Sequence, residues 1–215
     1  MKKRLLLFLP LIIFCFSSIV SQIDSTQYLL KQFEDATVYF KDGGQSSEKI
    51  NYNLIANSFF FIDKTDGSIK QISSTQDIRL IRIGNRSFIF NNEDAVEVIP
   101  INPLIYVQYK ADVREQGKKA AFGTTSETTA IRTYGATYNR GRRIEFDPNT
   151  VIAGKRYNIY WVEKKGKKKK FITFKQFLKI YPNHKIVLEQ YIKDNDIRFN
   201  DVEQIKNLCL YAESL

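Results

Sequence analysis

Histidine and cysteine are nearly absent from this sequence of 215 residues, which contains one histidine and two cysteines. His184 lies at the expected start of a helix, and we interpret it as a helix-entry or surface residue. A general base would need a nucleophile and an orienting carboxylate nearby. Cys15 belongs to a segment that we expect to be cleaved off, which leaves Cys209 without a disulfide partner. The sequence excludes a Cys/His metal site, and we expect neither a metal nor a cofactor.

Paired carboxylates could hydrolyse glycosidic bonds without histidine or cysteine. The candidates are Asp63 with Asp66 and Glu93 with Asp94. They lie in predicted turns, where acidic residues commonly bond to the local backbone. We therefore expect no enzyme, and a carboxylate-based hydrolase is the least favoured alternative.

Long apolar runs are missing after the first 21 residues. That segment has a basic head at 2–4, an apolar run at 5–16 and small residues at its end, the pattern of a secretory signal peptide. A membrane-spanning helix needs about 20 apolar residues, so a retained anchor is the weaker alternative. We expect cleavage between Ser21 and Gln22. The destination would be the periplasm, or the outer membrane or cell exterior beyond it.

Positive charge is concentrated in a few places. Of the formal net charge of +10, three charges belong to the expected signal peptide, and six lysines lie within residues 164–170. These six are Lys164, Lys165, Lys167, Lys168, Lys169 and Lys170. Nucleic-acid binders usually spread basic residues along a face and interleave aromatic residues with them. We therefore expect no nucleic acid as a partner.

Alternating apolar and polar residues predict an antiparallel β domain over residues 22–110. Ile50 and Tyr52, for example, alternate with polar neighbours, as in a half-buried strand. Seven or eight short runs of this kind are separated by turn signals such as Asp66-Gly67. This spacing is typical of a small sandwich, roll or barrel.

Residues 111–156 show no sustained period and are rich in glycine, threonine, serine and arginine. We expect a flexible basic connector there, because structureless connections much longer than about 15 residues are usually functional or disordered. Arg140, Arg142 and Arg143 are the connector residues that we add to a candidate anion-binding site.

Residues 157–215 predict a β-hairpin followed by three short helices. The hairpin strands are expected at 157–162 and 171–174, with the lysines at the tip around Gly166. Apolar residues at helical spacing begin at Phe174. The fold class is therefore α+β, with an N-terminal antiparallel sandwich or roll, a hairpin and a small C-terminal three-helix unit.

The third predicted helix has an apolar side that includes Val202, Ile205 and Cys209. This spacing places the three side chains on one helix face. We expect that face to point inward, which makes Cys209 a buried structural residue.

Several short motifs stand out in the second half of the chain. They are Gly123-Thr124-Thr125-Ser126, Phe177-Leu178, Tyr181-Pro182, Phe199-Asn200 and Asp201-Val202-Glu203. In these motifs the chain resembles uncharacterised secreted proteins of Gram-negative bacteria. The resemblance implies an exported bacterial protein and no particular mechanism.

The clustered lysines allow two interpretations. A charged hairpin end keeps a sheet edge soluble and unpaired. Alternatively, the lysines and connector arginines attract anionic lipid headgroups or acidic polymers, an attraction that salt screens. We expect an exported, non-enzymatic binding or assembly protein whose partner is another protein or an envelope component. A peripheral binder of anionic surfaces or polymers is the first alternative.

The signal-peptide pattern predicts that the mature chain begins at or near Gln22. N-terminal sequencing of the protein isolated from its native cells measures this directly. A chain that keeps Met1 and stays in the membrane fraction would contradict the signal peptide.

Overall fold

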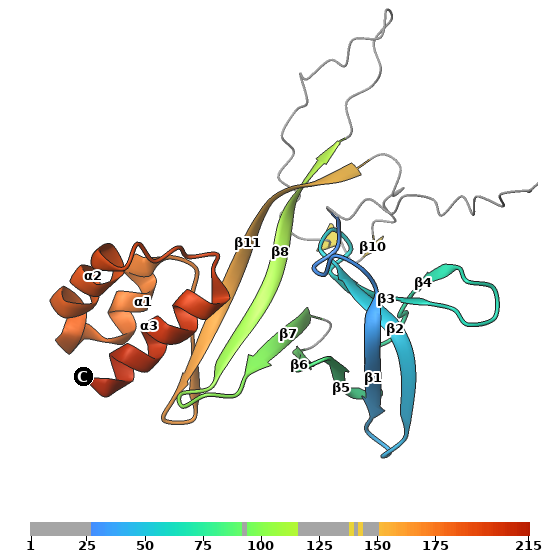
Figure 1. Cartoon of the computed structure of the whole chain (residues 1–215), viewed down its shortest axis with the longest axis horizontal. Helices are drawn as coiled ribbons and strands as arrows, with labels where there is room; N and C mark the ends of the chain where they lie inside the picture. Colours follow the sequence, from blue (N-terminus) through green and yellow to red (C-terminus); the bar gives the residue numbers. More distant parts are fainter. Residues whose placement is uncertain (1–26, 92–93, 116–137, 140–141, 144–150) are drawn as a thin grey trace, which may run out of the picture.

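The computed structural model describes residues 27–91, 94–115, 138–139, 142–143 and 151–215. These residues form a ten-stranded antiparallel sheet, a separate pair of very short strands and three C-terminal α-helices (Figure 1). The predicted α+β class is thus confirmed.

The strands vary widely in length. The first eight are β1 (Glu34–Phe40), β2 (Gln45–Asn53), β3 (Ser58–Ile62), β4 (Ile69–Gln71), β5 (Ile78–Ile83), β6 (Arg86–Asn91), β7 (Asp94–Ile99) and β8 (Ile105–Glu115). The others are β9 (Tyr138–Asn139), β10 (Arg142–Arg143), β11 (Val151–Lys164) and β12 (Lys167–Phe171). The helices are α1 (Phe174–Ile180), the 3-10 turn η2 (Pro182–His184), α2 (Lys185–Asp194) and α3 (Val202–Ser214).

The large sheet is open, and its strand order is β12-β11-β8-β7-β6-β5-β1-β2-β3-β4. The predicted sandwich or roll is not confirmed, because the described strands form one open sheet with β12 and β4 at its edges. The reason is the long hairpin β11–β12, which joins the N-terminal strands through β8 instead of standing apart from them.

The two longest strands extend further than the sequence pattern predicts. β8 continues to Glu115 and β11 begins at Val151, so both reach into the predicted connector at 111–156. The register of β11 shifts between Ala153 and Arg156. A bulge of this kind interrupts the period-2 alternation by which a strand is recognised in a sequence.

Successive side chains of a strand point to opposite faces, which gives the sheet two distinct sides. We call the side packed against α1–α3 the helix side and the opposite one the outer face. Residues directly opposite each other on neighbouring strands share a face, and the register sets Phe88, Glu97 and Val107 in one row. Phe88 belongs to a core cluster with β1 and β2, whereas Val107 belongs to a cluster with the helices. Both cores therefore lie on the helix side.

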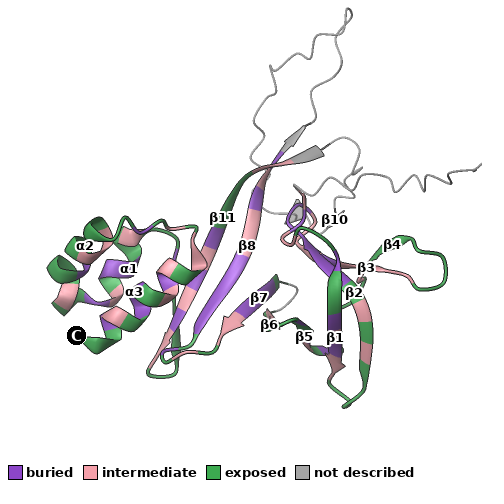
Figure 2. Ribbon diagram, viewed as in Figure 1, coloured by how far each residue is buried: buried purple, intermediate pink, exposed green. Residues whose placement is uncertain are grey.

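The helical unit packs on the end of the sheet formed by β8, β11 and β12 (Figure 1). The ring of Phe171 lies 5.3 Å from that of Tyr160 and 5.2 Å from that of Phe177, measured between centroids. Figure 2 shows buried stretches on β8 and β11 beside this unit. Side-chain oxygens of Thr173 and Asp201 cap α1 and α3. No helix in the described part of the chain is long and apolar enough to cross a membrane.

Cys209 points inward on α3, as its spacing predicts, and it is fully buried. Burial, together with the nearby Glu213 carboxylate, raises the pKa of its thiol to about 12. The thiolate is therefore unfavourable, and reagents that need it should not react with the folded protein.

We predict that Cys209→Asp lowers the free energy of unfolding by roughly 3 kcal/mol or more, because it buries an unpaired charge. Cys209→Ala is the matched control and should cost much less, since it removes only volume. Urea denaturation measures both. Rapid labelling of Cys209 by a thiol reagent in the native protein would contradict the buried position.

Candidate functional site

The lysine-rich hairpin closes with a turn of only two residues. Lys165 and Gly166 have φ angles of 52° and 71°, which is the left-handed conformation of a tight hairpin turn. The predicted lysine tip is therefore smaller than expected. Four of the lysines form the edge strand β12, which begins at Lys167 and ends where the second strand was expected to start.

Alternation divides these four lysines between the two sides of the sheet. Lys168 pairs with Glu163 and Lys170 with Trp161, whereas Lys167 pairs with Lys164 and Lys169 with Val162. Val162 belongs to the core under the helices. Lys168 and Lys170 therefore lie on the outer face, and Lys167 and Lys169 on the helix side, although all four are exposed at the edge.

Lys164 forms an ion pair within the fold, so we do not expect its charge to be available to a ligand. Its ammonium lies 2.9 Å from the Glu213 carboxylate and 3.8 Å from the centroid of the Tyr181 ring. Burial, the largest single effect, would raise the pKa of Glu213, but the hydrogen bond and charge of Lys164 and the contact with Tyr181 together outweigh it and hold this pKa below its usual value. Lys164 thus fastens α3 to the end of β11.

The outer face near β12 combines lysines with aromatic rings. The Lys168 ammonium lies 3.8 Å from the centroid of the Tyr106 ring, and Lys170 lies 5.7 Å from that of Trp161. The Tyr106 hydroxyl donates a hydrogen bond of 2.7 Å to Glu163. Burial and this carboxylate raise the pKa of Tyr106 to about 12, so the phenol keeps its proton.

The connector arginines of the candidate site stay a prediction. Arg140 lies outside the described residues. Arg142 and Arg143 form β10, which pairs with β9 in a sheet of its own. The side-chain contacts described for the sequence-predicted site are therefore those of the hairpin lysines.

The predicted turn acids are engaged with neighbouring residues. Asp63 and Asp66 lie 2.5 Å and 3.3 Å from the Lys70 ammonium. The hydrogen bond from Lys70, followed by that from Thr65, lowers the pKa of Asp63 to about 2. A carboxyl held ionised in this way cannot donate a proton near neutral pH, so this pair fits a structural turn.

The other residues considered as catalytic candidates do not form a cluster in the described part of the chain. Glu93 lies outside the described residues, Asp94 is 3.9 Å from Lys110, and His184 is the N-cap residue of α2. In the described part of the chain, no three His, Cys, Asp or Glu side chains come close enough to hold a metal ion.

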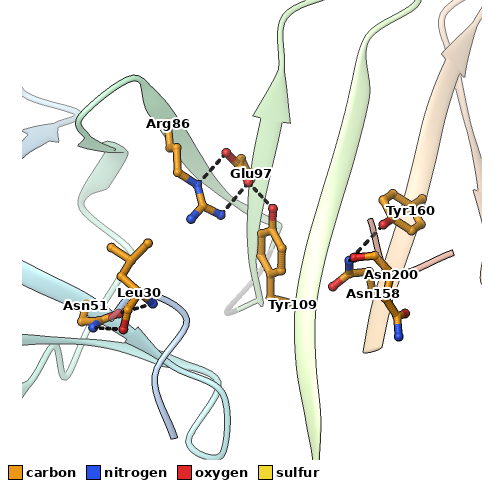
Figure 3. Close-up of polar contacts among 8 residues, drawn as sticks. All are labelled: Leu30, Asn51, Arg86, Glu97, Tyr109, Asn158, Tyr160 and Asn200. Atoms are coloured by element: carbon orange, nitrogen blue, oxygen red, sulfur yellow. Dashed lines mark hydrogen bonds and ion pairs between the residues drawn. The ribbon is translucent and has the colours of Figure 1, made fainter. Parts of the chain in front are cut away.

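Sequence reasoning missed an ion pair between the buried Glu97 and the half-buried Arg86, which lies between the two cores (Figure 3). Both oxygens of Glu97 accept hydrogen bonds from Arg86, at 2.9 Å and 2.8 Å. The Tyr109 hydroxyl donates to the same carboxylate. Burial and then Glu97 raise the pKa of Tyr109 well above its usual value, so it remains a donor. The only signal in the sequence is an acid at a position where the alternation of β7 demands an apolar residue.

A second buried polar contact joins the helical unit to the sheet (Figure 3). The Asn158 amide donates to the Tyr160 hydroxyl at 2.9 Å and to the backbone oxygen of Asn200 at 3.1 Å. The Tyr160 hydroxyl in turn donates to the backbone oxygen of Phe199. These bonds hold the segment before α3 against β11.

Comparison of the chain with protein-family models, curated proteins and solved structures finds no match.

We predict that Glu97→Leu lowers the free energy of unfolding by about 2 kcal/mol, because it leaves the half-buried Arg86 guanidinium without its carboxylate partner. The double variant Arg86→Met/Glu97→Leu removes both charges and should recover most of this loss. Urea denaturation of both proteins measures the difference. A single variant as stable as the parent chain would show that the pair does not hold the cores together.

Proposed function

We propose that the chain is an exported, non-enzymatic binding protein that recognises an anionic component of the cell envelope. The hairpin β11–β12 supplies the binding element. The proposal rests mainly on one observation: β12 is an edge strand that presents four consecutive exposed lysines.

The charge of this edge is available to a ligand. Among the described residues, no ion pair involves Lys165 or any of Lys167–Lys170, whereas Lys164 is paired with Glu213. Each lysine near an anionic surface contributes about 1 kcal/mol of attraction. Five exposed lysines at the end of this hairpin therefore suffice for salt-sensitive binding without a deep pocket.

Export supports an envelope partner over a cytoplasmic one. The basic head and apolar run at the N-terminus favour secretion, and so does the resemblance to secreted Gram-negative proteins. In the periplasm or at the cell surface, anionic lipid headgroups and acidic polysaccharides are the partners that this charge fits.

Assembly with another protein is the second candidate, and the same strand favours it. One side of β12 has no neighbouring strand in the sheet, and an extended peptide can add to such an edge. The lysines oppose that mode unless the added strand is acidic. A carboxylate-based hydrolase has the least support, because the predicted acid pair at Asp63 and Asp66 is bound to Lys70.

We predict that the mature protein binds dextran sulfate at low salt and that added salt weakens the binding. Changing Lys167, Lys168, Lys169 and Lys170 to Gln should reduce affinity by roughly 100- to 1,000-fold, because four lysines at about 1 kcal/mol each contribute up to about 4 kcal/mol. Titration calorimetry at several salt concentrations measures this.

The matched control changes four exposed lysines of the helical unit to Gln. They are Lys175, Lys179, Lys185 and Lys193. This variant has the same net charge and should bind nearly as well as the parent chain. Equal losses in the two variants would assign the binding to overall charge, and no binding at low salt would contradict the proposed function.

A further inference from the structure

We propose that the outer face around Trp161 docks on the surface of an anionic lipid bilayer. The inference rests on the proposed function and narrows its anionic component to lipid. We call this surface the Trp161 face. It consists of Leu104, Tyr106, Tyr157, Ile159, Trp161, Glu163, Lys168 and Lys170.

The register places these side chains on one face. Tyr157, Ile159 and Trp161 alternate along β11, and Trp161 lies opposite both Tyr106 and Lys170. The backbone N–H of Glu163 donates to the oxygen of Leu104 at 2.9 Å, which continues the β8–β11 ladder by one residue. The apolar residues thus form a band that borders the lysines of β12.

This band is partly open to solvent. Leu104 and Tyr157 are each 37% exposed, and Ile159 and Trp161 are half-buried. The core clusters of the described residues include none of these four. The Tyr106 ring is buried beneath Lys168 and contributes support to this surface, not accessible area. The helices pack on the opposite side, against residues such as Val107 and Val162. A band of large apolar side chains on the outer side of a sheet is a feature of docking surfaces.

The combination of residues fits a bilayer surface. Tryptophan and tyrosine favour the interface between headgroups and acyl chains, because one part of the ring system is apolar and the other polar. Lysines beside them can extend to anionic headgroups while their stems cover apolar surface. A polyanion in water would use the lysines and would leave the Leu104 and Trp161 side chains without a role.

The acidic residues of the region do not cancel this charge. The hydrogen bond from Tyr106 does not neutralise Glu163, but Lys168 and Lys170 outnumber this one carboxylate on the face. Asp94 lies beside Lys110. Asp112, near Tyr157, stands away from the lysines of β12. A second copy of the chain is a poorer occupant, because a symmetric contact would bring the lysines of two β12 strands together.

Trp161 is the only tryptophan of the chain, so the tryptophan fluorescence of the protein reports the environment of this one side chain. The mature protein is titrated with vesicles of phosphatidylcholine and phosphatidylglycerol, and with vesicles of phosphatidylcholine alone. We expect Trp161 emission to shift to shorter wavelength, and to be quenched by brominated acyl chains, only with the anionic vesicles.

Two variants test the apolar band and keep the reporter. Leu104→Ser and Tyr157→Ser should each weaken partition into anionic vesicles by roughly tenfold, the factor for losing about half of one buried apolar side chain. Ile186→Ser is the matched control, because Ile186 is 81% exposed on α2 and lies outside the Trp161 face. Circular dichroism checks that all three variants are folded.

The outcomes separate this inference from the proposed function. If the protein binds dextran sulfate but Trp161 emission does not change with anionic vesicles, the bilayer is the wrong ligand and the proposed function stands. Lysine-dependent vesicle binding without quenching by brominated chains overturns the inference in the same way. If neither ligand binds, both are wrong. A loss with Ile186→Ser equal to that with Leu104→Ser would move the docking surface to the helices.

Discussion

The ladder between β8 and β11 is the interaction on which the rest of the structure depends. It pairs ten residues of β8 with ten residues of β11. Among the described residues, it is the only strand pairing that connects the C-terminal hairpin to the N-terminal strands. Because alternate residues of a strand face opposite ways, the same ladder decides which side chains of β11 pack under the helices and which form the Trp161 face.

This constraint explains why polar groups are buried near the ladder. Tyr109 of β8 contacts both cores, and its hydroxyl meets the Arg86–Glu97 pair where the two cores join. Asn158 and Tyr160 of β11 hold the segment before α3 through its backbone oxygens. A buried ion pair is rarely a net source of stability, but an alternative packing would leave its charges unpaired. We interpret these contacts as the features that fix one arrangement of the helices on the sheet.

Local patterns in the sequence predicted local structure well. Alternation located most strands of residues 36–110, and helical spacing placed Cys209 on the buried side of α3. The single sheet could not be predicted in this way, because the pairing of β8 with β11 joins residues far apart in the chain. The bulge before Arg156 also hid the start of β11.

The sequence showed which residues the candidate site contains, but not how their side chains are arranged. Six lysines in seven positions were visible in the sequence. They are divided into Lys164 paired with Glu213, Lys165 in the turn, two lysines on the outer face and two on the helix side, and this division depends on the two-residue turn at Lys165-Gly166. The aromatic partners Tyr106 and Trp161 come from different strands, so only the pairing brings them to the lysines. The lysines that protect an open edge are then also the ones placed to bind an anionic surface.

Hydrogen–deuterium exchange with and without anionic vesicles tests most directly whether the outer face of the hairpin is the binding surface. The free edge of β12 exposes backbone amides that should exchange quickly in the unbound protein. The account predicts slower exchange on vesicle binding in β12 and the Lys165-Gly166 turn, with no change in α2. Slower exchange in α2 around Ile186, with β12 unchanged, would contradict it.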